Sequence, residues 1–72
     1  MRVWKKDEGK WCRYKYGDEV RTGIITEGGQ DKDPNDWLYR EAWLLDVEDF
    51  ESVLVFWSDI VALGPKVKPP KF

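Results

Sequence analysis

Residues 10–16 alternate strictly between two sets of side chains. One set is Cys12, Tyr14 and Tyr16, and the other is Trp11, Arg13 and Lys15. Successive side chains of a β-strand point to opposite faces of its sheet, so this spacing predicts a strand with one buried and one exposed face. The first expectation is therefore a fold built on a β-sheet.

The segment that precedes this strand is expected to pair with it. Residues 2–6 are joined to residues 10–16 by Asp7, Glu8 and Gly9. A three-residue connection that contains glycine is typical of a β-hairpin. We therefore predict an N-terminal hairpin over residues 2–16.

Further strands are expected along the chain. Residues 19–27 are rich in β-branched side chains, and Gly23 within them indicates a bulge or a sharp bend. Residues 53–57 form a continuous apolar run, which is typical of a central strand. A single 3₁₀ turn at Ser58-Asp59 is then expected before a short closing strand at residues 60–63.

Two overlapping segments are less regular. Residues 28–36 consist almost entirely of residues that break regular structure, which predicts a loop. Residues 34–47 fit two alternatives. Asp33 could cap a helix that begins at Pro34, or alternate residues from Trp37 to Val47 could share one face of a strand. We favour the strand.

The cysteine and histidine counts exclude several kinds of site. The 72-residue chain has no histidine and one cysteine, so it can form neither an internal disulfide nor a histidine-based nucleophile pair or zinc site. Five Trp, three Tyr and three Phe supply the apolar surface of a small core. We expect one cytoplasmic domain over residues 1–65, without catalytic residues, metal, cofactor or membrane segment, and an extended Pro- and Lys-rich tail over residues 66–72.

Charge is unevenly distributed along the chain. Residues 1–16 carry six basic and two acidic side chains, a net charge of +4. Residues 17–63 carry three basic and twelve acidic side chains, a net charge of −9, and residues 64–72 carry three lysines, a net charge of +3. Segregated charge of this kind can steer a partner of opposite charge.

Three short motifs carry a resemblance to a known fold family. They are Gly17-Asp18-Glu19-Val20, Gly23-Ile24-Ile25 and Ser58-Asp59-Ile60-Val61-Ala62-Leu63. In this order, over residues 17–63, they resemble the SH3-like small β-barrel superfamily, which includes Tudor-like and KOW-like domains. The resemblance implies an all-β fold, a small SH3-like barrel of five or six strands, here with an N-terminal hairpin and an extended C-terminal tail. It also implies binding rather than catalysis, because small SH3-like barrels are mostly non-enzymatic; this implication is an analogy at the level of the fold.

The leading hypothesis is a non-enzymatic protein-interaction module, either an adaptor or a small regulatory subunit of a larger assembly. Aromatic side chains would anchor the partner, and an acidic patch would select a basic one. The predicted protein-binding residues are Trp4, Trp11, Trp37, Asp46, Glu48, Asp49 and Glu51. The domain itself is expected to be a monomer or a weak oligomer.

Other binding functions stay open from the sequence. Nucleic acid could bind to interleaved cations and rings, because rings stack on bases and cations neutralise phosphates. The residues concerned are Lys5, Lys6, Lys10, Trp11, Arg13 and Lys15. The acidic body could instead inhibit a nucleic-acid-binding protein by mimicry. Tudor-like domains that bind methylated side chains use several aromatic rings and a carboxylate, and Tyr39, Trp43, Phe56 and Trp57 with Asp59 could supply such a cage, although no spacing here demands it.

Overall fold

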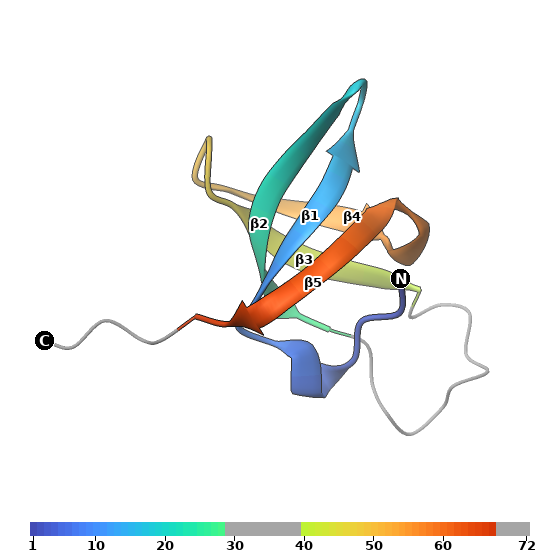
Figure 1. Cartoon of the computed structure of the whole chain (residues 1–72), viewed down its shortest axis with the longest axis vertical. Helices are drawn as coiled ribbons and strands as arrows, with labels where there is room; N and C mark the ends of the chain where they lie inside the picture. Colours follow the sequence, from blue (N-terminus) through green and yellow to red (C-terminus); the bar gives the residue numbers. More distant parts are fainter. Residues whose placement is uncertain (29–39, 68–72) are drawn as a thin grey trace, which may run out of the picture.

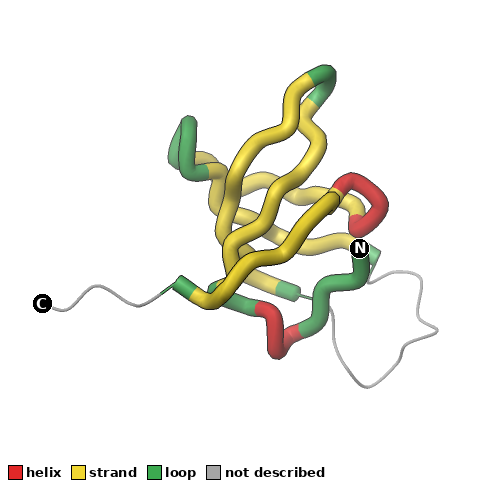
Figure 2. The backbone as a smooth tube through the Cα atoms, viewed as in Figure 1, coloured by secondary structure: helices red, strands yellow, loops and turns green. Residues whose placement is uncertain are grey.

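The computed structural model describes residues 1–28 and 40–67 as an all-β unit. It contains β1 (Lys10–Tyr16), β2 (Glu19–Glu27), β3 (Glu41–Asp46), β4 (Glu51–Phe56) and β5 (Ile60–Lys66). Two short 3₁₀ turns accompany the strands, η1 (Lys5–Asp7) and η3 (Trp57–Asp59). These elements and their connections are shown in Figures 1 and 2.

All five strands belong to one antiparallel sheet with the order β4-β3-β2-β1-β5. Strands β1 to β4 follow one another as a meander, and the chain then returns so that β5 pairs with β1. The sheet is strongly curved, with β5 and β1 crossing in front of β3 and β4 in Figure 1. Strands β4 and β5 are the two edges, so the hydrogen-bonded sheet is not closed.

The concave face of the sheet holds the core. It is composed of alternate residues from the five strands together with one residue of the N-terminal segment: Val3, Cys12, Tyr14, Ile25, Ala42, Leu44, Val55 and Ile60. The alternation of residues 10–16 is confirmed, because Cys12 and Tyr14 are buried whereas Arg13 and Lys15 are exposed. Tyr16 continues this parity beyond the core and is 45 % exposed.

The hairpin expected over residues 2–16 is not formed. Residues 5–7 make the 3₁₀ turn η1, and β1 pairs with β2 and β5 instead. Asp7 stabilises the turn, since its carboxylate accepts hydrogen bonds from the Trp4 N–H at 2.9 Å and from Lys10 Nζ at 2.7 Å. The N-terminal segment then places Val3, which is fully buried, against the core.

Strand β2 covers residues 19–27 as predicted, but its irregularity lies elsewhere. The register with β1 is continuous through Gly23, and the register with β3 begins at Gly23 and shifts between Ile25 and Glu27. Gly23 is needed for close packing, because a Cβ at this position would lie 3.0 Å from the Leu45 carbonyl oxygen and 3.4 Å from the Tyr14 ring.

The predictions for residues 40–67 are partly confirmed and partly wrong. Residues 41–46 form a strand rather than a helix, and residues 57–59 form the expected 3₁₀ turn before β5. Strand β4 was expected to be central and is instead an edge, since it pairs only with β3. The loop at residues 29–36 and the tail at residues 68–72 lie outside the described residues.

Candidate protein-binding surface

Most of the acidic residues predicted to bind a partner surround one arginine. Arg21 on β2 lies 2.6 Å from the Asp49 carboxylate, 3.0 Å from Glu19 and 3.6 Å from Glu48. Its guanidinium also lies 4.3 Å from the centre of the Tyr16 ring, within cation–π range. The hydrogen bonds that Arg21 donates to Asp49 and then to Glu19 raise the pKa of Arg21. Arg21 therefore offsets part of the negative charge that would select a basic partner.

Asp46 was predicted to be a surface residue, and this prediction is wrong. Its side chain is only 3 % exposed, and it accepts hydrogen bonds from the Tyr14 hydroxyl and from the N–H groups of Glu48 and Asp49. The bond from Tyr14 lowers the pKa of Asp46 most, against the opposing effect of burial. Asp46 shapes the turn from β3 to β4 and is not available to a partner. Glu48, Asp49 and Glu51 remain exposed.

The predicted tryptophans do not join this acidic turn. Trp4 packs edge-on against Trp57, with ring centroids 5.3 Å apart, and lies beside Gly28 at the end of β2. Arg21, at the acidic turn, lies near the opposite end of β2. It precedes Gly28 by seven residues, and an extended chain of this length spans roughly 20 Å. Trp11 is half-buried on the outer face of β1, and Trp37 lies outside the described residues. The surface predicted from these residues is therefore not assembled as one patch.

A different set of apolar side chains is exposed together. On the outer face of the sheet, Trp43 of β3 pairs with Leu54 of β4, and Phe56 lies two residues further along β4. Their exposed fractions are 41 %, 48 % and 58 %. We call Trp43, Leu54 and Phe56 the apolar stripe. Because Ala42, Leu44 and Asp46 face the core, the odd-numbered residues of β3 must face outward.

Sequence reasoning considered Trp43 and Phe56 only as members of an aromatic cage. Trp57, another proposed member, packs against Trp4 and the core instead, and Tyr39 lies outside the described residues. The signal that could have revealed the stripe is the parity of residues 41–46. Ala42 and Leu44 share one parity and are buried, which leaves Trp43 on the other face.

Acidic side chains border the apolar stripe. Glu27 is the register partner of Trp43 across β2 and β3, and Glu41 is the register partner of Phe56 across β3 and β4. Glu8 lines the same shallow cavity as Glu27 and Trp43. Within the described chain, none of these three carboxylates lies within ion-pair distance of a lysine or arginine. The outer face of β2–β4 thus combines apolar contact area with negative charge.

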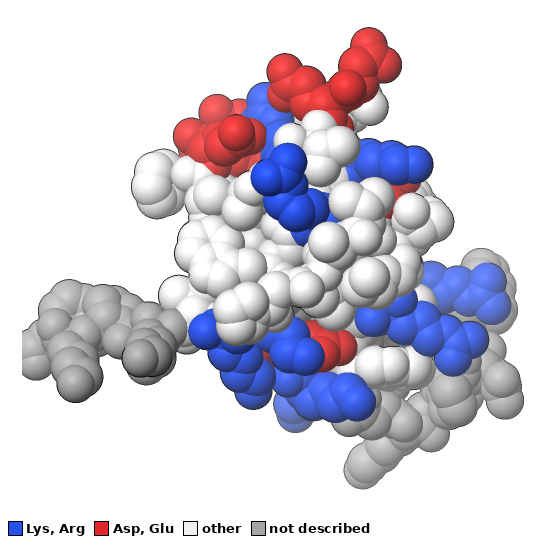
Figure 3. Space-filling model, viewed as in Figure 1, with Lys and Arg blue, Asp and Glu red and all other residues white. Residues whose placement is uncertain are grey.

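The basic residues predicted to bind nucleic acid are divided between two places. Lys5 and Lys6 lie exposed on η1, where Lys10 is held by Asp7. Trp11, Arg13 and Lys15 lie on the outer face of β1. Figure 3 shows acidic side chains gathered over the end of the molecule with the β1–β2 and β3–β4 turns, and basic ones around η1 and the end of β5.

Among residues 1–28 and 40–67, no group of three or more His, Cys, Asp or Glu side chains is arranged to hold a metal ion. No helix in those ranges has the length and apolarity needed to cross a membrane. Cys12 is buried, and burial raises its pKa to about 11 despite an opposing hydrogen bond with the Gly23 backbone.

Comparisons with protein-family models, with curated proteins and with solved structures found no match.

Proposed function

We propose that this chain is a non-enzymatic protein-interaction module that binds its partner through the apolar stripe on the outer face of β3 and β4. The observation that carries this proposal is the adjacency of Trp43, Leu54 and Phe56, each more than 40 % exposed. Contiguous exposed apolar side chains rimmed by polar ones are typical of protein-binding surfaces, and tryptophan is enriched at their energetic centres.

The charge around the stripe supports a partner with both apolar and basic side chains. Glu27 and Glu41 flank the stripe and have no cationic partner among the described residues. Like charges would disfavour an acidic partner at this face, and complementary charges speed the encounter with a basic one. An adaptor or a small regulatory subunit of a larger assembly would use such a face.

The proposed scaffold is an SH3-like small barrel. Three features support it: the meander β1 to β4, the return of β5 to the side of β1, and the 3₁₀ turn η3 directly before β5. Strand β5 includes Pro65, which is compatible with its position at an edge.

Selection of peptides against the intact chain tests the proposed surface. A phage-displayed library of random twelve-residue peptides is panned on the wild-type protein, and the selected peptides are then titrated against Leu54→Ser and Phe56→Ser. We expect both variants to weaken binding at least tenfold. Val61→Ser is the matched control, because Val61 is a similarly exposed apolar residue on β5. Failure to select any peptide, or equal loss in all three variants, would refute the proposal.

A second candidate function is nucleic-acid binding at the outer face of β1. The observation that favours it is that Trp11, Arg13 and Lys15 share this face, beside a shallow cavity of about 340 Å³ that Trp11 and Arg13 line with β5. Single-stranded oligonucleotides titrated at two salt concentrations test this candidate. Affinity should fall steeply with salt and be lost in Arg13→Glu. Absence of binding at low salt eliminates it.

A further inference from the structure

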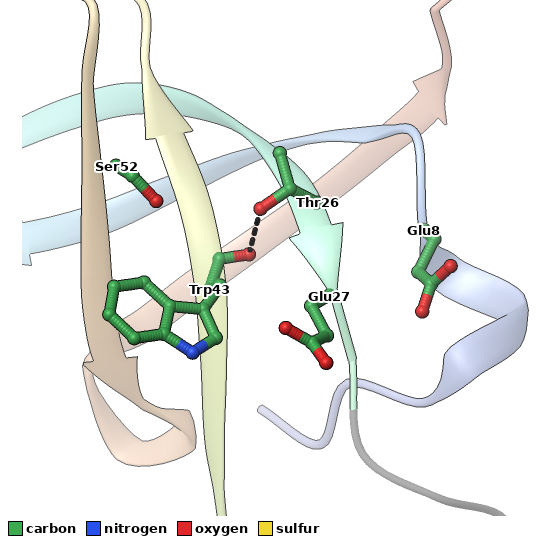
Figure 4. Close-up of a pocket in the computed structure, with 5 residues that line it drawn as sticks. All are labelled: Glu8, Thr26, Glu27, Trp43 and Ser52. Atoms are coloured by element: carbon green, nitrogen blue, oxygen red, sulfur yellow. Dashed lines mark hydrogen bonds between the residues drawn. The ribbon is translucent and has the colours of Figure 1, made fainter.

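A shallow cavity of about 480 Å³ adjoins the apolar stripe. It is lined by Glu8, Thr26, Glu27, Trp43 and Ser52, which come from the end of η1, where Glu8 is the C-cap, and from β2, β3 and β4. Figure 4 shows the Trp43 indole on one side, the Glu27 carboxyl next to it and Glu8 beyond. The cavity therefore presents one aromatic ring and two carboxylates to the same space.

A side-chain hydrogen bond connects the two strands, β2 and β3, that border the cavity. The Thr26 hydroxyl donates a hydrogen bond to the Trp43 carbonyl at 3.1 Å, at the point where the register between β2 and β3 shifts. The shift makes Glu27, rather than Thr26, the register partner of Trp43. The shift thus sets Glu27 opposite Trp43 in the register, and both residues line the cavity.

The two carboxylates of the cavity differ in their ion pairing from the carboxylates near the other end of β2. There, Arg21 already pairs with Glu19, Glu48 and Asp49. At the cavity, Glu27 is exposed, and Glu8 accepts only a long hydrogen bond of 3.4 Å from the Gly28 N–H. Among the described residues, no lysine or arginine forms an ion pair with these two carboxylates. Both can therefore pair with a cation that a partner supplies.

Guanidinium chemistry fits this arrangement better than an ammonium group does. A planar guanidinium stacks on an indole face and donates several hydrogen bonds in its plane, so it can contact Trp43 and a carboxylate at once. Contact with the indole displaces part of the cation's hydration shell, and this displacement costs the weakly hydrated guanidinium less than it costs an ammonium ion.

We infer that the cavity formed by Trp43, Glu27 and Glu8 binds an arginine side chain of the protein partner. The inference rests on the proposed function, because the same partner would cover the apolar stripe beside the cavity. Stripe and cavity together specify a segment in which an arginine lies next to apolar residues.

The test uses a probe that needs no knowledge of the partner. N-acetyl-arginine amide is titrated into the ¹⁵N-labelled chain, and chemical shifts of the Trp43 indole N–H and the Thr26 and Glu27 amides are followed. N-acetyl-citrulline amide, which is uncharged and has nearly the same shape, is the matched probe. We expect saturable shifts at these positions in the millimolar range, and at least tenfold weaker binding of the citrulline compound.

Two variants distinguish binding of the arginine probe at the cavity from nonspecific attraction to the acidic surface. Glu27→Gln should weaken binding of the arginine probe at least tenfold and remove most of the preference over citrulline. Glu51→Gln, at an exposed acidic position of β4 outside the cavity, should leave it unchanged. Both substitutions lie at exposed positions, and the unshifted remainder of the spectrum reports that each variant is folded.

Each contrary outcome is specific. Absence of saturable shifts, equal binding of citrulline, or shifts centred on Glu48 and Asp49 would each overturn the arginine site. None of these results would affect the peptide selection, which reports on Leu54 and Phe56. If peptides bind through the stripe but their arginines can be replaced by citrulline without loss, the proposed function stands and this inference fails.

Discussion

The Tyr14 hydroxyl on β1 donates a hydrogen bond to the carboxylate of Asp46, which lies 32 residues further along the chain at the end of β3. Both side chains are almost completely buried. The same carboxylate accepts the N–H groups of Glu48 and Asp49 in the turn that follows. One buried carboxylate therefore connects the centre of the sheet to the β3–β4 turn.

Tyr14→Phe should destabilise the fold by about 1–3 kcal/mol, because it leaves a buried carboxylate with one donor fewer. The unfolding free energy from urea denaturation measures the effect. Tyr16→Phe is the control, since Tyr16 is largely exposed and its hydroxyl makes no hydrogen bond to the described residues. We expect a change within about 0.5 kcal/mol for the control. Equal effects of the two substitutions would contradict the role of the Tyr14–Asp46 bond.

Stability should decrease in acid. The pKa of Asp46 is lowered mainly by the Tyr14 hydrogen bond. Burial raises the pKa of Asp7, but the hydrogen bonds from Lys10 and the Trp4 N–H outweigh it, so that pKa is lowered too. Both groups stabilise the fold above their unfolded pKa of about 4, and this contribution is lost as pH falls through the folded values. Unfolding free energy measured from pH 7 to pH 2 should fall, and Asp46→Asn should flatten the fall. An unchanged profile in that variant would refute the assignment.

Stability should also decrease in alkali. Burial raises the pKa of Cys12 from about 9 to about 11, and burial followed by the bond to Asp46 raises the pKa of Tyr14. Both groups are neutral in the fold, so their contribution is present below their unfolded pKa and is lost as pH rises through the folded values. Chemical denaturation from pH 8 to pH 11 should show this loss. Cys12→Ala should reduce the slope between pH 9 and pH 11, and an identical slope would count against it.

The Cys12 thiol should be protected from modification in the native state. Its side chain is buried and its raised pKa leaves little thiolate near neutral pH. With a thiol-specific disulfide reagent at pH 8, we expect labelling at least 100-fold slower than in denaturant. The unfolded chain provides the internal reference, because it carries the same single cysteine. Rapid labelling of the native protein would show that the inner face of β1 is accessible.

Gly23→Ala should destabilise the fold by about 1–3 kcal/mol, because the added methyl group would press against the Leu45 carbonyl oxygen and the Tyr14 ring. Thermal and urea unfolding measure the effect. Thr22→Ala, at the neighbouring outward-facing position, should change stability by less than about 1 kcal/mol. If the alanine at position 23 were tolerated as well as that at position 22, the close packing of β1, β2 and β3 would not constrain the fold.

Local pattern was sufficient for the strands whose two faces differ clearly. Residues 10–16 and 19–27 form β1 and β2 with the predicted bounds, and the turn before β5 lies at the predicted place. In these segments, period-two alternation and β-branched content reflect a physical difference between core and solvent. The expected N-terminal hairpin failed because Asp7 forms side-chain hydrogen bonds that close a 3₁₀ turn instead.

The sequence by itself predicted the β-strands of residues 10–16 and 19–27 and the inward position of Cys12 and Tyr14, and it determined that the chain contains neither histidine nor a disulfide pair. Only the tertiary structure decided which acidic residues are free: Asp46 is enclosed and Asp49 is paired with Arg21, whereas Glu27 lies beside Trp43. Strand register controls these relations, and a shift of one residue would exchange the two faces of β3. The outward position of Trp43 follows from that register, which depends on contacts between segments far apart in the sequence.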